Sequence, residues 1–350
     1  KLAEQRSEDA PLFSISSPEL MQQYLGNTMQ LSASSLERYQ KCPFRYYCND
    51  ILRLYQRQKV QMNAANYGSM VHYCLEQLLR KYDKKSFLAL TAEQLQQEIQ
   101  TSAAVYWQEN MGGDFSKSER EQAAYHHAVE EVLPVCQHLQ EEFRQSAFVP
   151  YCTELQISSE NPNFPPICLH TEAGQTVKLI GKIDRVDLCK DKDKVYVKVL
   201  DYKTGSKAFD VVALYHGLQL QLMVYMDAAV KMTQKHYPDS EVIPAGVFYY
   251  RLNDPLVEKK VVGEEEEIWQ KVLKELKVDG VMNLKDETLE HLDHCQAGES
   301  AVIPVKYNKN GSLSKNSKVA SEQEFEVMMR HALGKVFKVH QKILSGEVAA

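Results

Sequence analysis

Through the first third of the chain, apolar residues recur every three or four positions, which is the spacing of one face of an α-helix. This pattern predicts helices over about residues 64–82, 91–111 and 117–146. The segment Met111-Gly112-Gly113-Asp114 separates the last two, because consecutive glycines interrupt a helix. The first third of the protein is therefore expected to be helical.

The segment that precedes these helices is less regular. Residues 1 to 30 are polar without sustained periodicity, and we expect them to form a linker or arm. The next stretch predicts a helix that reaches Phe44 and is capped by the hydroxyl group of Ser32 or Ser34. Pro43 is expected to bend or break this helix.

Near Phe148 the pattern changes to alternating apolar and polar residues, many of them β-branched, which is typical of strands. Strands are predicted in the segments that share this pattern: residues 148–157, 176–189, 194–202, 245–250 and 256–258. The charged run Lys190-Asp191-Lys192-Asp193-Lys194 separates two of them and predicts a hairpin turn. A long helix is predicted over residues 209–235.

This order of elements predicts an α/β fold with a mixed central sheet, flanked by an N-terminal helical region. We expect the helical region over residues 31–147 and the core over residues 148–350, ending in a C-terminal helix, as one integrated domain. The sequence starts without methionine and ends abruptly in a helical pattern at Ala350, so we expect a piece of a longer protein.

Composition narrows the class of protein. With 350 residues and 44% hydrophobic content, the chain can bury a substantial core. It has no run of roughly 18 apolar residues, as a membrane span requires, and no apolar signal core, so we expect a cytoplasmic protein without membrane contact. The eight cysteines are scattered without a Cys-x2-Cys pair, which suggests neither a disulfide framework nor a zinc site.

A net charge of −6 argues against a nucleic-acid partner, because phosphate binding needs positive charge. Basic residues are nevertheless concentrated in two places: Arg80, Lys81, Lys84 and Lys85, and then Lys306, Lys309, Lys315 and Lys318. These clusters either contact phosphate or are ordinary solvated surface, and the sequence leaves both interpretations open.

Two predicted strands carry the charged residues that a metal site needs. Side chains alternate along a strand, so Asp201 and Lys203 share one face. If the strand that bears Asp184 pairs with this one, a second carboxylate reaches the same point, and carboxylate oxygens are what Mg²⁺ prefers. The alternative is an exposed hairpin in which Arg185 and Lys203 pair with carboxylates. The apolar residues that lead into Asp201 favour the metal site, because a solvated hairpin needs no buried strand.

Three further polar residues are candidates. Gln221 and Tyr225 lie four positions apart on the helix predicted after the lysine strand, so they share a face and can contact a DNA phosphate. His72 lies on the helix predicted at residues 64–82. Each also fits a structural role, as a buried amide in a core helix or as a structural histidine.

Four short blocks occur in one order along the chain: Gly68-x3-His72, Gly181-x2-Asp184, Asp201-x-Lys203 and Gln221-x3-Tyr225. Together they resemble the PD-(D/E)xK nuclease superfamily in its RecB-like branch, which implies a restriction-endonuclease-like core. The resemblance implies these metal ligands: His72, Asp184, Asp201 and the backbone carbonyl of Tyr202. It also implies that Lys203 is the catalytic lysine and that Gln221 and Tyr225 organise the site.

The resemblance extends to the nuclease domains of AddAB-type helicase–nucleases, over Leu31 to Tyr47 and Val302 to Glu322. It implies a Mg²⁺-dependent DNA exonuclease, with Mn²⁺ as a substitute, that cuts a single strand from an unwound duplex end during double-strand-break processing. The chain has no Gly-x4-Gly-Lys-Ser/Thr loop, so ATP hydrolysis would belong to a partner, an AddA-type helicase/nuclease subunit. The alternative is a DNA-binding scaffold of the same fold that does not cut.

The same resemblance implies an iron–sulfur cofactor. The related domains hold a 4Fe-4S cluster through a cysteine equivalent to Cys42 and three more beyond the nuclease core. Such a cluster needs four thiolates, and the other cysteines of this chain offer no second group with the required spacing. We therefore expect the cluster in the full-length parent and not in this piece.

Overall fold

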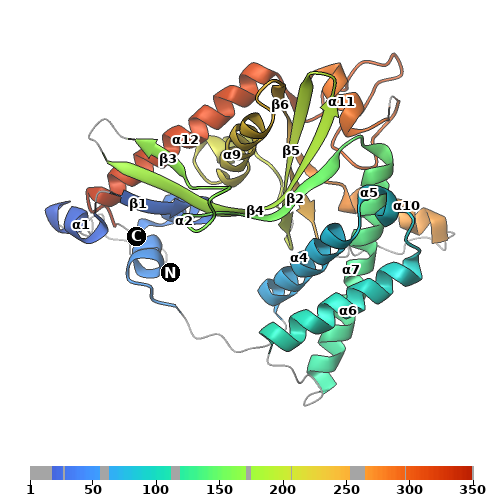
Figure 1. Ribbon diagram of the computed structural model, residues 1–350, viewed down its shortest axis with the longest axis horizontal. Coiled ribbons are helices and arrows are strands. Elements are labelled where there is room, and N and C mark those ends of the chain that lie inside the picture. The colour runs from blue at the N-terminus through green and yellow to red at the C-terminus, as the bar shows by residue number, and fades with distance from the viewer. Residues whose placement is uncertain are drawn as a thin grey trace, which may run out of the picture.

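The computed structural model describes residues 18–26, 28–55, 63–111, 119–170, 175–205, 207–252, 265–295 and 297–348. Their centre is an eight-stranded mixed sheet with helices packed on it (Figure 1). This architecture confirms the predicted α/β fold with a mixed sheet. Among the described residues, no helix is long and apolar enough to cross a membrane.

The helices lie in two groups, with α4, α6 and α7 beside one part of the sheet and α9 and α12 beside another (Figure 1). The helical elements are α1 (Pro18–Leu25), α2 (Ala33–Lys41), α3 (Pro43–Tyr46), the π-helical turn η1 (Tyr47–Ile51), α4 (Ala64–Lys81), α5 (Lys84–Leu88), α6 (Ala92–Asn110), α7 (Glu119–Gln145), α8 (Val211–Tyr215), α9 (Gln221–His236), α10 (Glu265–Leu276), α11 (Asp286–Leu292) and α12 (Glu322–Leu344).

The sheet is ordered β1-β4-β5-β6-β7-β8, and β2 and β3 also pair with β4. The strands are β1 (Thr28–Ser32), β2 (Val149–Ile157), β3 (Ile167–His170), β4 (Thr176–Asp191), β5 (Lys194–Lys203), β6 (Glu241–Arg251), β7 (Asp279–Asn283) and β8 (Val319–Ala320). The pairs β1–β4, β5–β6 and β7–β8 are parallel, and the other pairs are antiparallel. The long β4–β5 hairpin therefore lies at the centre.

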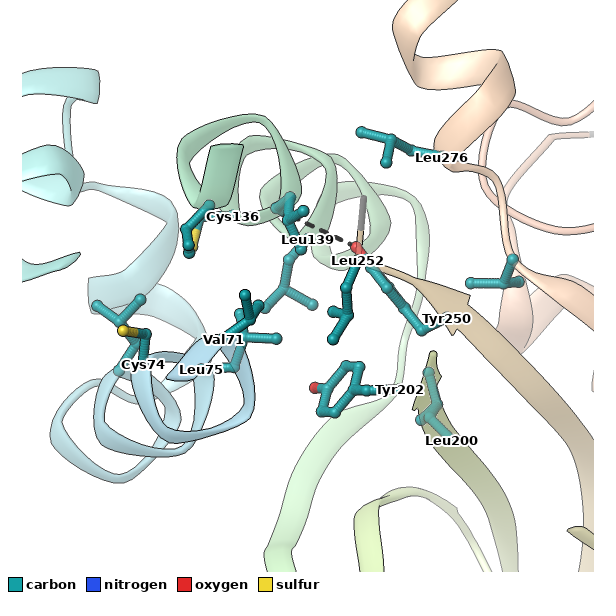
Figure 2. Close-up of a cluster of buried hydrophobic side chains, with 14 of the residues drawn as sticks. Val71, Cys74, Leu75, Cys136, Leu139, Leu200, Tyr202, Tyr250, Leu252 and Leu276 are labelled. Atoms are coloured by element: carbon teal, nitrogen blue, oxygen red, sulfur yellow. Dashed lines mark hydrogen bonds between the residues drawn. The ribbon is translucent and has the colours of Figure 1, made fainter. Parts of the chain in front are cut away.

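Strand β5 is buried on both faces, and its alternating side chains enter two hydrophobic cores. Tyr196, Leu200 and Tyr202 belong to the core that α4, α6 and α7 cover. Val195, Val197 and Val199 belong to the core that α9 and α12 cover. Figure 2 shows Tyr202 and Tyr250 from the sheet beside side chains of α4 and α7 in the first core. A strand covered on both faces explains the apolar run before Asp201.

A group of buried charges joins α7 to the hairpin. Glu142 of α7 accepts hydrogen bonds through Oε1 from Lys198 Nζ at 2.6 Å and from Arg185 Nη2 at 2.9 Å. Asp187 accepts from Arg185 Nε at 2.7 Å and lies 2.9 Å from Lys198 Nζ. All four side chains are almost fully buried. The interpretation of this hairpin as an exposed, solvated element is therefore wrong, although Arg185 does pair with carboxylates.

Several predicted boundaries agree closely with the structure. Helices α4, α6 and α7 fall within a few residues of the predicted ranges. Ser32 caps α2, since its hydroxyl group accepts from the backbone N–H of Ser35 at 3.1 Å. Pro43 ends that helix and occupies the first turn of α3.

The prediction of a linker over residues 1–30 was wrong for residues 18–30, which contain α1 and most of β1; residues 1–17 lie outside the described part of the chain. Met29 and Leu31 are buried because β1 pairs with β4 and every second side chain points into the core. A strand of five residues is too short to show periodicity beside polar neighbours.

The helix predicted over residues 209–235 is divided into α8 and α9. Gly217, between them, has a φ of +81°, a left-handed conformation in which a helix ends. The strand predicted at residues 245–250 is confirmed as part of β6, whereas the one predicted at 256–258 lies outside the described residues.

Candidate active site

Two aspartates meet where strands β4 and β5 stop pairing. The ladder ends at Arg185 and Leu200, and the next residues are Asp184 on one strand and Asp201 on the other. The backbone N–H of Tyr202 donates to Asp184 Oδ2 at 2.7 Å. The two predicted strands therefore do pair, and they bring both carboxylates to one end of the hairpin.

Lys203 lies on the same face of β5 as Asp201, as strand alternation predicts. Its ammonium group forms an ion pair with Asp201 Oδ2 and lies 3.5 Å from Gln221 Oε1. Gln221 begins α9 and donates from Nε2 to Asp201 Oδ1 at 2.6 Å. The amide of Gln221 thus contacts both the carboxylate and the lysine and fixes their relative positions.

His72 approaches the aspartates from α4. Its Nδ1 lies 3.2 Å from Glu154 Oε1 and 3.6 Å from Asp184 Oδ1. Ligand atoms of His72, Glu154 and Asp184 all lie within 4.8 Å of one another, as in a site for one cation. Of the predicted residues, the structure brings together His72, Asp184, Asp201, Lys203 and Gln221, and it adds Glu154.

Glu154 was not predicted as a site residue, although the sequence contained an indication of its role. It is the one charged residue in the predicted strand 148–157. The pairs Thr153–Arg185 and Leu155–Ile183 place it opposite Asp184. Its φ of +53° lies in the left-handed region that a glutamate seldom adopts, a feature that is common at functional sites.

The electrostatics of the site are those of closely spaced carboxylates. Burial, and then the charge of Asp201, raise the pKa of Asp184 to about 7. Burial opposes the charged form of His72, but the hydrogen bond to Glu154 and the charge of Asp184 hold its pKa above the ordinary value. Burial also opposes ionisation of Glu154, yet hydrogen bonds with His72 and Lys182 lower its pKa. A bound cation would offset this concentration of negative charge.

The donor set fits a divalent metal ion. Carboxylate oxygens from Asp184, Asp201 and Glu154 are the hard ligands that Mg²⁺ prefers, and Mn²⁺ also accepts the imidazole of His72. The backbone carbonyl of Tyr202 belongs to the residue whose N–H contacts Asp184. Protein groups can thus supply part of a coordination shell and leave positions for water and substrate.

Tyr225 lies beside this group rather than in it. Its hydroxyl group has Gln221 and the backbone of Lys182 as hydrogen-bond partners, and burial raises its pKa. Cys42 lies elsewhere, at the junction of α2 and α3, where its Sγ accepts from the backbone N–H of Arg45 at 3.4 Å.

Three of the four basic residues at 80–85, Arg80, Lys81 and Lys84, are engaged within the protein. Arg80 lies 2.7 Å from Glu76, and Lys81 lies 2.7 Å from Glu98. Lys84 donates to backbone carbonyls after α7. These contacts favour the interpretation of this cluster as surface and structural charge, and not as a phosphate-binding patch.

Two glycines allow the elements of the site to approach each other. A Cβ atom on Gly68 would lie 2.8 Å from Thr204 Cγ2, so glycine lets α4 pack against the end of β5 one turn before His72. A Cβ atom on Gly181 would lie 2.9 Å from the hydroxyl oxygen of Tyr225. The glycines of two sequence blocks thus have a steric role next to the candidate site residues.

Gly181→Ala is expected to destabilise the protein by about 1–3 kcal/mol, because the added methyl group overlaps the buried ring of Tyr225. Gly334→Ala is the matched control, since a Cβ atom there has nothing within 4 Å. Position 334 lies inside helix α12, where alanine is more favourable than glycine by about 1 kcal/mol, so this variant should be stabilised. Urea unfolding measures both changes. Equal stability of wild type and Gly181→Ala would contradict the steric account.

The comparisons with known proteins agree with this geometry. The family model described as the PD-(D/E)XK nuclease superfamily matches residues 30–306. Proteins named as the B component of an ATP-dependent helicase/deoxyribonuclease are similar to the chain, with 32% identity over 339 residues in Clostridium novyi (strain NT) and 31% over 324 residues in Alkaliphilus oremlandii (strain OhILAs). The alignments cover 95% and 91% of this chain.

The chain spans only 29% and 28% of the length of these two relatives. Their names confirm the resemblance to the AddB-type component of AddAB helicase–nucleases. Because the family model matches most of the chain, and because the paired aspartates and the lysine lie together at the end of the β4–β5 hairpin, the chain belongs to the PD-(D/E)XK nuclease superfamily.

Proposed function

We propose that this chain is a Mg²⁺-dependent deoxyribonuclease that hydrolyses phosphodiester bonds of single-stranded DNA. One observation carries the proposal: Asp184, Asp201 and Lys203 meet at the open end of a buried hairpin, with His72 and Glu154 directly beside them. A DNA-binding module that has lost its activity would be expected to lack the lysine or one of the carboxylates. In this chain all of them are present.

In this proposal the metal ligands are the side chains of His72, Glu154, Asp184 and Asp201, with the backbone carbonyl of Tyr202. A bound Mg²⁺ would lower the pKa of a coordinated water and stabilise negative charge on the phosphate. Mn²⁺ is expected to substitute, because its ligand preferences are similar.

Lys203 is proposed as the catalytic lysine. Its ammonium group can orient the attacking water, help to deprotonate it and offset the charge that develops on the phosphate. Gln221 holds Lys203 and Asp201 in register through its two hydrogen bonds. Tyr225 supports this arrangement through its contact with Gln221 and positions the helix against β4.

The wider setting is also proposed. The relatives are named as components of a helicase/deoxyribonuclease, which supports DNA as substrate and a partner of the AddA type that supplies the motor. We propose an exonuclease that acts on a strand from an unwound duplex end during double-strand-break processing. Two further expectations stay predictions. One is a 4Fe-4S cluster in the full-length parent, with Cys42 as one ligand, and the other is a cytoplasmic location.

The test is cleavage of end-labelled and of circular single-stranded DNA with Mg²⁺, with Mn²⁺ and with EDTA. Wild type should shorten the linear strand from an end with either metal and should be inactive in EDTA. Asp201→Asn should be inactive, and Asp227→Asn, at a surface pair with Lys231, should cut like wild type. Equal cleavage by wild type and Asp201→Asn would exclude the site, and cleavage of the circle would exclude an obligatory exonuclease.

A further inference from the structure

A cavity of about 650 Å³ extends from the metal-binding group toward helices α4 and α6. Glu154 and Lys203 of the sheet line it next to His72 of α4, at the metal-binding end. Tyr73 and Tyr106 line it at the helices. The reaction as proposed uses the first group and leaves the second without a role.

The two groups differ in charge. At the sheet, the ammonium groups of Lys182 and Lys203 pair with Glu154 and Asp201, so cations lie next to the metal ligands. At the helices the charged lining residues are carboxylates, those of Glu76 and Glu109. With a divalent cation bound beside Lys182 and Lys203, a phosphate is attracted to the first group. The second group offers Glu109 and a Glu76 that pairs with Arg80, so a bound nucleotide has one favoured orientation.

The helical end presents an aromatic surface. The rings of Tyr73 and Tyr106 are in contact, with centroids 5.7 Å apart and planes inclined at 48°. Tyr106 is buried and Tyr73 is half-buried, so the second ring supports the first while part of the first faces the cavity.

A nucleobase suits this end of the cavity. Its flat face stacks on aromatic side chains, and the amino groups on its edge donate to carboxylates such as those of Glu76 and Glu109. A base within a duplex has both faces stacked and its edge paired, so only an unpaired base can enter.

We infer that Tyr73, supported by Tyr106, is the stacking surface for one unpaired nucleobase of the strand being cut. This inference rests on the proposed function, because the phosphate of that strand must lie at the metal-binding group. It goes further, since it assigns a base-binding subsite to helices α4 and α6 and explains selection of single-stranded over duplex DNA at the cleavage site.

The test uses the 350-residue chain and a set of single-stranded oligonucleotides, each with one abasic site at a different distance from the end that is cut. For wild type, one position is expected to lower kcat/KM by about 5- to 100-fold, the range that one stacked base contributes. Tyr73→Ala should lower kcat/KM for the intact strand by a similar factor and should no longer distinguish the abasic strand. Tyr73→Phe keeps the ring and should behave like wild type.

Tyr82→Ala is the matched control, because Tyr82 follows the same helix and lies outside the cavity. Binding of the same oligonucleotides with Ca²⁺ in place of Mg²⁺, followed by fluorescence anisotropy, gives a readout without cleavage. If wild type binds the oligonucleotides but does not cut them, the proposed function is contradicted. The binding measurement still tests the subsite in that case. An abasic penalty that is absent in wild type, or that persists in Tyr73→Ala, overturns the subsite.

Discussion

Lys203→Met is expected to lower the rate of DNA cleavage by about 10²- to 10³-fold, the loss typical of removing one preorganised group that stabilises charge in a transition state. Methionine keeps most of the aliphatic volume and removes only the ammonium group that contacts Asp201 and Gln221. The fold should survive, because this side chain is partly exposed at the end of β5. Single-turnover cleavage of labelled single-stranded DNA measures the loss.

The matched control is Lys231→Met on the outer face of α9, whose ammonium group lies 2.7 Å from Asp227 in an exposed pair. It removes the same charge without touching the site and should leave the rate unchanged. Mg²⁺ should still bind to Lys203→Met, because lysine is not a ligand. A rate for Lys203→Met within about a factor of two of wild type would contradict the catalytic role.

Glu142→Gln is expected to destabilise the folded chain by about 3–5 kcal/mol, because it leaves Lys198 and Arg185 buried with Asp187 as their remaining counter-ion. Glutamine has the same shape, so packing of α7 on the hairpin changes little. The measurement is the free energy of unfolding in urea at neutral pH.

Glu326→Gln is the matched control for Glu142→Gln. It breaks a pair with Arg330 on the surface of α12, where both side chains are exposed, and should cost less than about 1 kcal/mol of stability.

The pH dependence of stability adds a second check on Glu142. Burial opposes ionisation of Glu142, but Arg185 and Lys198 lower its pKa below the ordinary 4.5. Its stabilising effect is therefore complete above pH 4.5 and is lost as the pH falls through the lowered value. The difference between wild type and Glu142→Gln should shrink in acid, and a constant difference would contradict the charge-based account.

The sequence was most informative where local periodicity and chemistry coincide. The β4–β5 hairpin could be predicted because a charged turn separates two β-branched strands, and alternation alone placed Asp201 and Lys203 on one face. The resemblance of the ordered blocks then predicted that His72 and Gln221 belong to the same site as this hairpin. Local sequence rules cannot predict this, because the two residues come from α4 and α9.

Other features depend on contacts between distant segments. Strand β1 forms because it pairs in parallel with β4. Its five residues are too few for an alternating pattern to predict a strand from the sequence. Glu154 becomes part of the site only through the register of β2 on β4. The buried charges of Arg185 and Lys198 appear solvated in the sequence, since their partner Glu142 lies in a helix more than forty residues earlier.

The central claim is that this group of carboxylates and histidine holds the metal ion for DNA hydrolysis. Calorimetric titration of Mg²⁺ into wild type, Asp184→Asn and Asp227→Asn tests it most directly, because asparagine preserves the buried shape and removes the ligand charge. We predict a site in wild type and in Asp227→Asn, and at least about tenfold weaker binding in Asp184→Asn. Equal Mg²⁺ affinity in wild type and Asp184→Asn would contradict the claim.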